Sequence, residues 1–192
     1  FLMAENTTCR ISHTAERWMR LGREISQKGQ RHKRRGMLFP DALKKCVIGP
    51  STVMMEKSLF TKLGGFREDL EIAEDYELWL RLCCAEEVCY LDEPLTVKQA
   101  GYEKTLNGIA GQLSEKYGHI EYFSMIALKD LVESGYFRGP NCNCLEAFNA
   151  DRLARRELGR KARIFAAGAR KRGREEEARD FERLAGRMNN KA

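Results

Sequence analysis

The sequence predicts an α/β fold over residues 1–105, followed by a helical extension over residues 106–192. Two observations predict this division. In the first part, short runs of β-forming residues alternate with segments of helical period. In the second part, apolar residues recur at helical spacing almost throughout. The composition is that of a globular protein, since 43% of the 192 residues are hydrophobic and 32% are charged.

The beginning of the α/β part is expected to hold a helix, a basic loop and a bent strand. Apolar residues in Ile11 to Ile25 follow a helical spacing, which predicts a helix. Residues 27–36, QKGQRHKRRG, combine two glycines with five Lys or Arg and predict a basic loop. A short helix is expected over Met37–Lys45. The β-rich runs that follow predict a central strand over Val47–Met55, bent near Pro50.

The rest of the α/β part is expected to hold two helices and two strands. Lys57–Leu63 predicts a short helix stopped by a pair of glycines. Glu74–Cys84 predicts a second helix, because its apolar residues gather on one face. Two strands are expected over Val88–Leu91 and Leu95–Val97, separated by an Asp-Glu-Pro turn.

The helical part is expected to contain four helical segments. Ile109, Leu113 and Tyr117 step by four, and a second segment runs over residues 120–132. The last two helices, about 152–170 and 175–187, are predicted to pack as an antiparallel hairpin outside the α/β part.

Seven cysteines occur, and their spacing excludes a zinc ribbon because paired C-x-x-C units are missing. Cys142 and Cys144 flank one Asn, so they could bind a metal or pair with a partner. The simpler interpretation is that both residues are free thiols in a loop of a protein kept in a reducing compartment. The amino-terminal residues do not resemble a signal peptide. We expect them to lie within a longer chain. We therefore expect a cytoplasmic protein.

The net charge of +6 comes from the end of the chain, since residues 151–192 hold 14 Lys or Arg and 7 Asp or Glu. A basic tail of this kind is typical of the solvated face of a helix pair. The alternatives are contact with nucleic acid or with anionic lipid at the inner face of the membrane. We expect no nucleic acid and keep a peripheral membrane contact open.

Residues 59–101, LFTKLGGFREDLEIAEDYELWLRLCCAEEVCYLDEPLTVKQAG, carry the most specific pattern. They combine an LGGF turn, a Glu-Asp pair that opens a helix, an L-W-L-R continuation and a D-E-P-L segment. VIGPSTVMMEKSLF precedes them at residues 47–60. In this order the segments resemble the second half of family 2 glycosyltransferases. HTAERWMRLG at residues 13–22 resembles one bacterial subgroup of that family.

This resemblance implies half of a GT-A fold, a Rossmann-like mixed sheet, and transfer of a sugar from a nucleotide-sugar donor. The acceptor would be a polysaccharide, a lipid-linked sugar or a protein. Such transfer needs a base for the acceptor hydroxyl, and the resemblance assigns that role to Asp75. Glu74 would position the acceptor or its loop. The alternative is that both carboxylates only favour the helix start.

The same resemblance suggests residues around the substrate. Gly64 and Gly65 would let the backbone approach a sugar, although a simple helix stop explains them equally well. Ser51 lies where the donor sugar is bound in the family. Trp79 is interpreted mainly as a core residue, and Arg81 as a brace for an internal carboxylate.

The basic loop and the metal site depend on the resemblance too. His32 and Lys33 would close over a diphosphate leaving group, or belong to a solvated charge run. The family binds a divalent metal, Mg or Mn, through an Asp-x-Asp sequence that this chain lacks. Tyr102 stands where the family often has a His, and Tyr is a poor ligand for such a metal. The metal is therefore expected for an intact enzyme, with ligands outside this chain.

Two further functions compete with glycosyl transfer. The chain could be a non-catalytic remnant or interaction module that lacks the donor-binding half. It could also be an adaptor that works through its basic tail.

Overall fold

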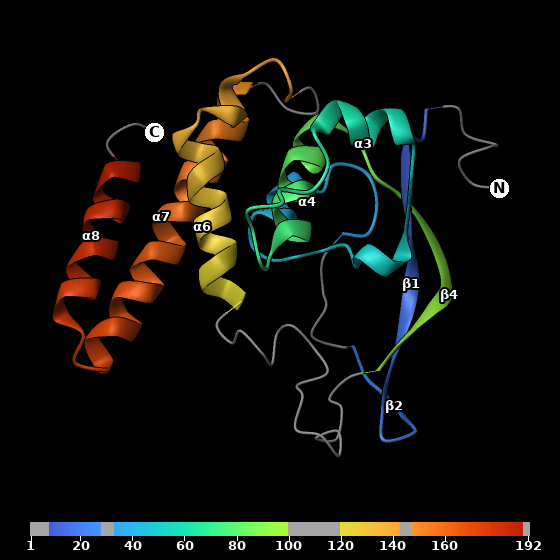
Figure 1. Cartoon of the computed structure of the whole chain (residues 1–192), viewed down its shortest axis with the longest axis horizontal. Helices are drawn as coiled ribbons and strands as arrows, with labels where there is room; N and C mark the ends of the chain where they lie inside the picture. The colour runs from blue at the N-terminus through green and yellow to red at the C-terminus, as the bar shows by residue number, and fades with distance from the viewer. Residues whose placement is uncertain (1–7, 28–32, 100–119, 143–146, 190–192) are drawn as a thin grey trace.

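The computed structural model describes residues 8–27, 33–99, 120–142 and 147–189. The described chain has a small four-stranded sheet at one side and helices at the other, so the expected α/β class is confirmed. Figure 1 shows α4 (Glu74–Ala85) between the sheet and three later helices, α6 (Ile120–Glu133), α7 (Ala147–Lys171) and α8 (Glu175–Asn189), with α8 lying farthest from the sheet.

Strand β1 (Ile11–Arg20) is the centre of the sheet. It pairs antiparallel with β2 (Arg23–Ile25) and with β3 (Val53–Met55), each over three residues. Along its other edge it pairs in parallel with β4 (Cys89–Gln99). The sheet is therefore mixed, and β1 is the strand from which side chains reach toward the helices.

The predicted helix over Ile11–Ile25 is wrong, because these residues form the β1–β2 hairpin. Its two-residue turn is made by Leu21 and Gly22, with φ of 48° and 73°. Positive φ at both central positions is the geometry that matches the twist of paired strands. The helical spacing was misleading because β1 begins buried on both faces. Ile11 and His13 are buried on one face and Ser12 on the other, so the start of the strand does not alternate between apolar and polar residues.

The predicted central strand over Val47–Met55 is wrong in its extent and its place. Pro50–Thr52 form a 3-10 turn, η1, and only β3 that follows is extended. Gly49 O accepts the backbone N–H of Thr52 at 2.9 Å and its hydroxyl at 2.7 Å, which closes the turn. These bonds occupy the groups that a continuous strand would use for pairing.

The two strands predicted on either side of the Asp-Glu-Pro turn are one strand, β4. Thr14 pairs with Leu91 and the next residue, Ala15, pairs with Pro94, so an irregularity in the ladder absorbs the extra residues. Pro94 has no N–H to donate, and an edge strand is where a sheet tolerates it.

The expected helices of the α/β part are confirmed within a few residues. They are α2 (Phe39–Ala42), α3 (Lys57–Leu63) and α4 (Glu74–Ala85). Gly64 follows α3 with φ of 87°, the left-handed conformation that ends helices.

The carboxy-terminal helices are also confirmed. They are α6 (Ile120–Glu133), the 3-10 turn η2 (Tyr136–Arg138), α7 (Ala147–Lys171) and α8 (Glu175–Asn189). The rings of Phe165 and Phe181 lie 5.5 Å apart, so α7 and α8 form the expected hairpin. The predicted stripe at residues 109, 113 and 117 lies outside the described residues.

Two disulfides join distant parts of the chain, Cys9 to Cys89 and Cys84 to Cys142. The interpretation of Cys142 as a loop thiol is therefore wrong, since the residue is buried against Cys84 of α4. Cys144 lies outside the described residues. None of the described helices is both long enough and apolar enough to cross a bilayer.

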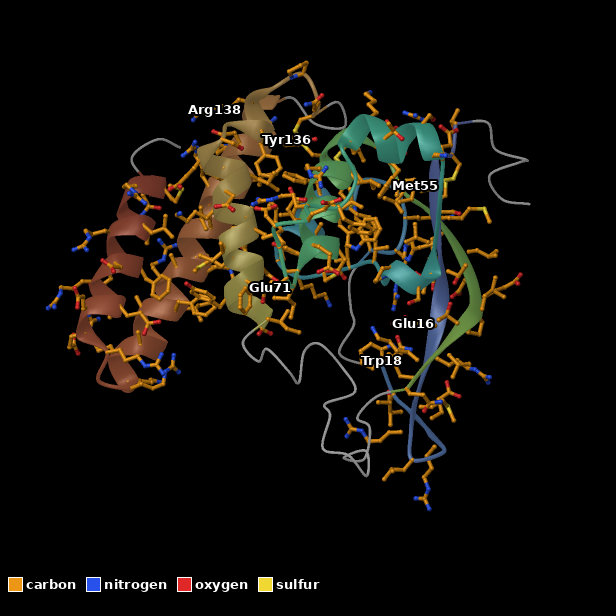
Figure 2. All side chains as sticks on the ribbon, in the orientation of Figure 1. Glu16, Trp18, Met55, Glu71, Tyr136 and Arg138 are labelled. Carbon is orange, nitrogen blue, oxygen red and sulfur yellow. A yellow bond between two sulfur atoms is a disulfide. The ribbon has the colours of Figure 1, made fainter. Side chains whose placement is uncertain are left out.

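One hydrophobic core runs from the sheet to the last helix. It joins Ile11 of β1 and the apolar face of α4 to buried residues of α6, α7 and α8. Glu16 and Trp18 project from β1 on the side where the helices lie, whereas Tyr136 and Arg138 lie at the far end of α6 (Figure 2).

Candidate functional site

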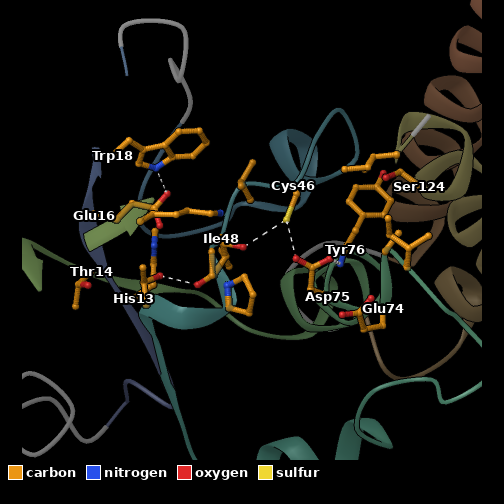
Figure 3. Close-up of a pocket in the computed structure, with 18 of the residues that line it drawn as sticks. His13, Thr14, Glu16, Trp18, Cys46, Ile48, Glu74, Asp75, Tyr76 and Ser124 are labelled. Carbon is orange, nitrogen blue, oxygen red and sulfur yellow. Dashed lines mark hydrogen bonds between the residues drawn. The ribbon is translucent and has the colours of Figure 1, made fainter. Parts of the chain in front are cut away.

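A pocket of about 490 Å³ opens between the sheet and the amino-terminal end of α4. Its walls come from β1, from residues 46–52, from the start of α4 and from the start of α6 (Figure 3). Carboxylates, two cations, an imidazole, a thiol and hydroxyls line it; they are Glu16, Glu74, Asp75, Arg34, Lys98, His13, Cys46, Thr14, Thr52 and Ser124. Apolar side chains complete the walls, so the pocket combines polar groups with apolar surface and is of a size to hold a sugar-containing molecule.

Both predicted catalytic carboxylates line this pocket. Glu74 and Asp75 are the first two residues of α4 and are half-buried. Asp75 Oδ1 accepts the backbone N–H of Tyr76 at 2.6 Å. The amides and dipole of a helix start attract negatively charged groups, so the fold places both carboxylates where a helix start favours them.

The residue before this pair has a strained backbone. Ala73 has φ of 67°, in the left-handed region that residues with a Cβ rarely adopt. Its carbonyl accepts the N–H of Glu77 at 3.0 Å, so α4 starts directly after the strained residue. Strain of this kind persists only where surrounding structure enforces it. Here it turns the chain so that α4 begins at the pocket.

Cys46 lies beside Asp75 in the pocket wall (Figure 3). Its Sγ lies 3.7 Å from Asp75 Oδ2 and 3.4 Å from Ile48 O. Although the residue keeps surface exposure, protein atoms around the sulfur and the adjacent carboxylate raise the pKa of the Cys46 thiol. The thiol therefore stays protonated, and its single proton can be donated either to the Ile48 carbonyl or to Asp75.

The opposite wall is built around Glu16 and Trp18. Trp18 Nε1 donates to Glu16 Oε1 at 2.5 Å, and Lys98 Nζ lies 5.1 Å from the centre of the indole ring. A Cβ at Gly49 would lie 3.1 Å from Glu16 Oε2, so the glycine leaves room for this carboxylate. An oriented indole beside a carboxylate and an ammonium group can offer both an apolar face and hydrogen bonds to a sugar.

His13 lies at the base of the pocket. Its Nε2 is 2.6 Å from Arg34 O, and its ring lies 4.8 Å from that of Tyr90. Burial lowers the pKa of His13 below its ordinary value. The imidazole is therefore neutral near pH 7 and can donate one hydrogen bond to the Arg34 carbonyl.

Six of the predicted substrate-binding residues lie outside the pocket lining, and four of these, Gly64, Gly65, Trp79 and Arg81, belong to α4 or to the turn that ends α3. Trp79 is 2% exposed and Arg81 is 6% exposed, both within the core around α4. Arg81 pairs with the buried Glu77 and donates to the carbonyls of Leu63 and Gly65. The predicted brace for an internal carboxylate is confirmed, and Gly64–Gly65 form the helix stop that receives it.

Two further predicted substrate residues, Ser51 and Lys33, also lie outside the pocket lining. Ser51 is exposed beside the pocket, and its carbonyl accepts the Thr96 hydroxyl at 3.2 Å. Lys33 is exposed and outside the lining, whereas its neighbour Arg34 contributes to it. His32 and Tyr102 lie outside the described residues, so their roles stay predictions.

Sequence reasoning missed the pocket residues of β1, β4 and residues 46–49. Glu16 and Trp18 were assigned to a helix, Lys98 was given no role, and Cys46 was read as part of a strand. The signal that could have indicated β1 is Gly22 in the sequence Leu21-Gly22, because a glycine at this position suits a two-residue hairpin turn between strands.

Glu74 and Asp75 supply oxygen ligands of the type that Mg or Mn prefers, and such an ion commonly completes its coordination with water and substrate phosphates. Among residues 8–27, 33–99, 120–142 and 147–189, no three His, Cys, Asp or Glu side chains are grouped as a metal site.

Comparisons of this chain with protein-family models, with curated proteins and with solved structures found no match.

Proposed function

We propose that this chain is the acceptor-binding, base-bearing half of a glycosyltransferase related to family 2, with half of a Rossmann-like GT-A sheet. The donor would be a nucleotide sugar, and the acceptor a polysaccharide, a lipid-linked sugar or a protein. The observation that carries the proposal is Asp75, a half-buried carboxylate at a helix start that lines a pocket of about 490 Å³ with polar and apolar walls. The mixed sheet, with β1 parallel to β4 and antiparallel to β3, is compatible with the GT-A half.

In the proposed reaction an acceptor hydroxyl lies within hydrogen-bond reach of Asp75. Asp75 takes the hydroxyl proton while the oxygen attacks the anomeric carbon of the donor sugar. The bond from that carbon to the diphosphate breaks, and the nucleoside diphosphate leaves with the electron pair. Asp75 Oδ1 accepts the Tyr76 amide and Oδ2 lies within reach of the Cys46 thiol, which leaves each oxygen a lone pair for the acceptor.

The wall that faces Asp75 would bind the acceptor sugar. Trp18 provides a ring that is held by Glu16, and Glu16 and Lys98 provide an acceptor and a donor for hydroxyl groups. Glu74 adjoins the base and would orient the acceptor. Arg34 and Lys98 are the pocket's cations, and they would face the negative charge that develops on the leaving group.

The test is a transfer assay on a protein in which this region is preceded by a nucleotide-binding half. Purified protein is given uridine, guanosine and thymidine diphosphate sugars with membrane or polysaccharide acceptors, and products are identified by mass spectrometry. We expect one donor to be consumed with sugar gained by the acceptor. If a folded protein consumes no donor, and Asp75→Asn and wild type behave alike, the proposal is wrong.

A further inference from the structure

The segment that carries Cys46 is held from two sides by residues far away in the sequence. Tyr76 of α4 donates its hydroxyl to Leu43 O at 2.8 Å. Lys161 of α7 donates its ammonium group to Lys44 O at 2.8 Å, across 117 residues of sequence. Two consecutive carbonyls, three and two residues before Cys46, are thus fixed by separate donors.

Lys161 is an unusual residue for a surface helix, because only 8% of it is exposed. Its Nζ lies 6.0 Å from the centre of the Tyr76 ring and 4.0 Å from Glu157 Oε1. Burying an ammonium group is costly unless it is hydrogen-bonded and paired. The hydrogen bond to Lys44 O therefore compensates for burial of the Lys161 ammonium group. It joins α7 to the segment that leads into the pocket wall.

The fixed carbonyls bear directly on the pocket. After Lys44 the chain passes through Cys46, Ile48 and Gly49, which all line it. The Cys46 thiol then reaches Asp75 Oδ2 at 3.7 Å. A continuous set of contacts therefore runs from α7, through residues 43–46, to the carboxylate at the start of α4.

We infer that Lys161 and Tyr76 are positioning residues, which hold residues 43–46 so that Cys46 is directed at Asp75. The carboxy-terminal helices would then take part in shaping the pocket as well as in covering the core. The importance of Asp75 rests on the proposed function, but the placement of Cys46 does not. A readout that needs neither donor nor acceptor therefore separates the two ideas.

The experiment measures how fast iodoacetamide alkylates Cys46 in the whole chain, with peptide mass spectrometry to identify the site. Cys46 is exposed and not in a disulfide, so it can react in the native protein. Lys161→Met keeps the length of the side chain and removes its donor. We expect alkylation of Cys46 to become about tenfold faster, since a hydrogen bond from a charged donor is worth about that factor or more. The carbon-13 resonance of the Asp75 carboxyl should shift in the same variant.

Lys171→Met is the matched control, because Lys171 ends the same helix and is exposed. It should leave both readouts at their wild-type values. The proposal is overturned if Lys161→Met folds and keeps the wild-type alkylation rate and Asp75 resonance. If Lys161→Met does not fold, Tyr76→Phe decides instead. It removes only the hydroxyl, so faster alkylation supports the proposal and an unchanged rate overturns it.

Discussion

Arg81 and Glu77 form an ion pair inside the protein, one turn apart on α4, with the guanidinium Nε 2.9 Å from Glu77 Oε1. The same guanidinium donates to the Gly65 carbonyl at 2.7 Å, which joins the end of α3 to α4. The L-W-L-R segment therefore contributes to the architecture behind the pocket, while the Glu-Asp pair at the other end of α4 faces the pocket.

Removal of Arg81 should consequently destabilise the fold. Arg81→Met leaves the Glu77 carboxylate buried without its cation, and breaking a buried pair from one side costs about 3–5 kcal/mol. Urea unfolding monitored by circular dichroism measures the change. The control Arg179→Met removes an exposed Arg of α8 and should have little effect. Stability equal to wild type in Arg81→Met would contradict a structural role.

Asp75→Asn should abolish most sugar transfer in the complete enzyme while the protein stays folded. The substitution keeps the shape of the side chain but removes the proton acceptor, and general-base catalysis contributes about 10²–10⁴-fold. Initial rates and donor affinity are measured together, and donor affinity should be retained. Glu74→Gln should cost less, because Glu74 is assigned an orienting role.

The matched control for these two variants is Glu71→Gln, an exposed carboxylate three residues before Glu74 that is not part of the pocket lining. It should transfer sugar at the wild-type rate. Near-normal transfer by Asp75→Asn would remove the base assignment.

The chain of 192 residues alone should not turn over nucleotide sugars at a useful rate. Stabilisation of a departing diphosphate by a metal is worth several kcal/mol, and the described residues hold no group of three metal ligands. Release of nucleoside diphosphate is measured with uridine, guanosine and thymidine diphosphate sugars, with and without Mg or Mn. Metal-dependent donor turnover by the purified chain would show this expectation to be wrong.

The stability of the fold should fall as the pH is lowered through the ordinary pKa of histidine, about 6.5. Burial lowers the pKa of His13 in the folded state, so the unfolded chain takes up the proton first. Stability from this source is complete above the unfolded pKa and is lost as the pH falls toward the folded value. Urea unfolding between pH 7.5 and pH 5, values chosen to span about 6.5, checks the slope. His13→Gln should have a shallower slope, and an equal slope in both proteins would exclude His13 as the cause.

The disulfide between Cys84 and Cys142 should contribute to stability. It closes a separation of 58 residues, and a loop of that size corresponds to about 4 kcal/mol in the chain-entropy description. The double variant Cys84→Ala/Cys142→Ala should lose most of this amount under oxidising conditions. Peptide mapping without reductant tests the pairing itself. With reductant present, the free energies of unfolding of wild type and variant should become nearly equal. A large remaining difference would show that the variant is destabilised by altered core packing and not by loss of the disulfide.

The sequence was informative where a helix has one apolar face and a defined end. α3 was predicted because two glycines follow it, and α4 because its apolar residues repeat along one side. β1 was missed because its buried start and its polar later residues do not alternate, and a buried strand cannot be recognised from period alone. The 3-10 turn at Pro50–Thr52 was missed because hydrogen bonds to one carbonyl, that of Gly49, outweigh the β preference of the neighbouring residues.

The candidate site was predicted only where it is contiguous in sequence. Glu74 and Asp75 stand together and could be found from the resemblance. Trp18, Cys46 and Lys98 reach the pocket from three separate segments. The parallel pairing of β1 with β4 places Trp18 beside Lys98, whereas Cys46 comes from the segment between α2 and η1. Such a meeting depends on tertiary structure, and no spacing along the chain reports it.

The pairing of β1 with β4 also governs the order in which the molecule can assemble. Residue 12 lies opposite residue 89, so this part of the sheet must close a long loop of chain before its hydrogen bonds form. The α7–α8 hairpin needs only a short turn and therefore can form early. We therefore expect the closing sheet to bring Trp18 and Lys98 opposite Asp75 late in folding. On this expectation the pocket would be among the last features to form and among the first to be lost when the sheet opens.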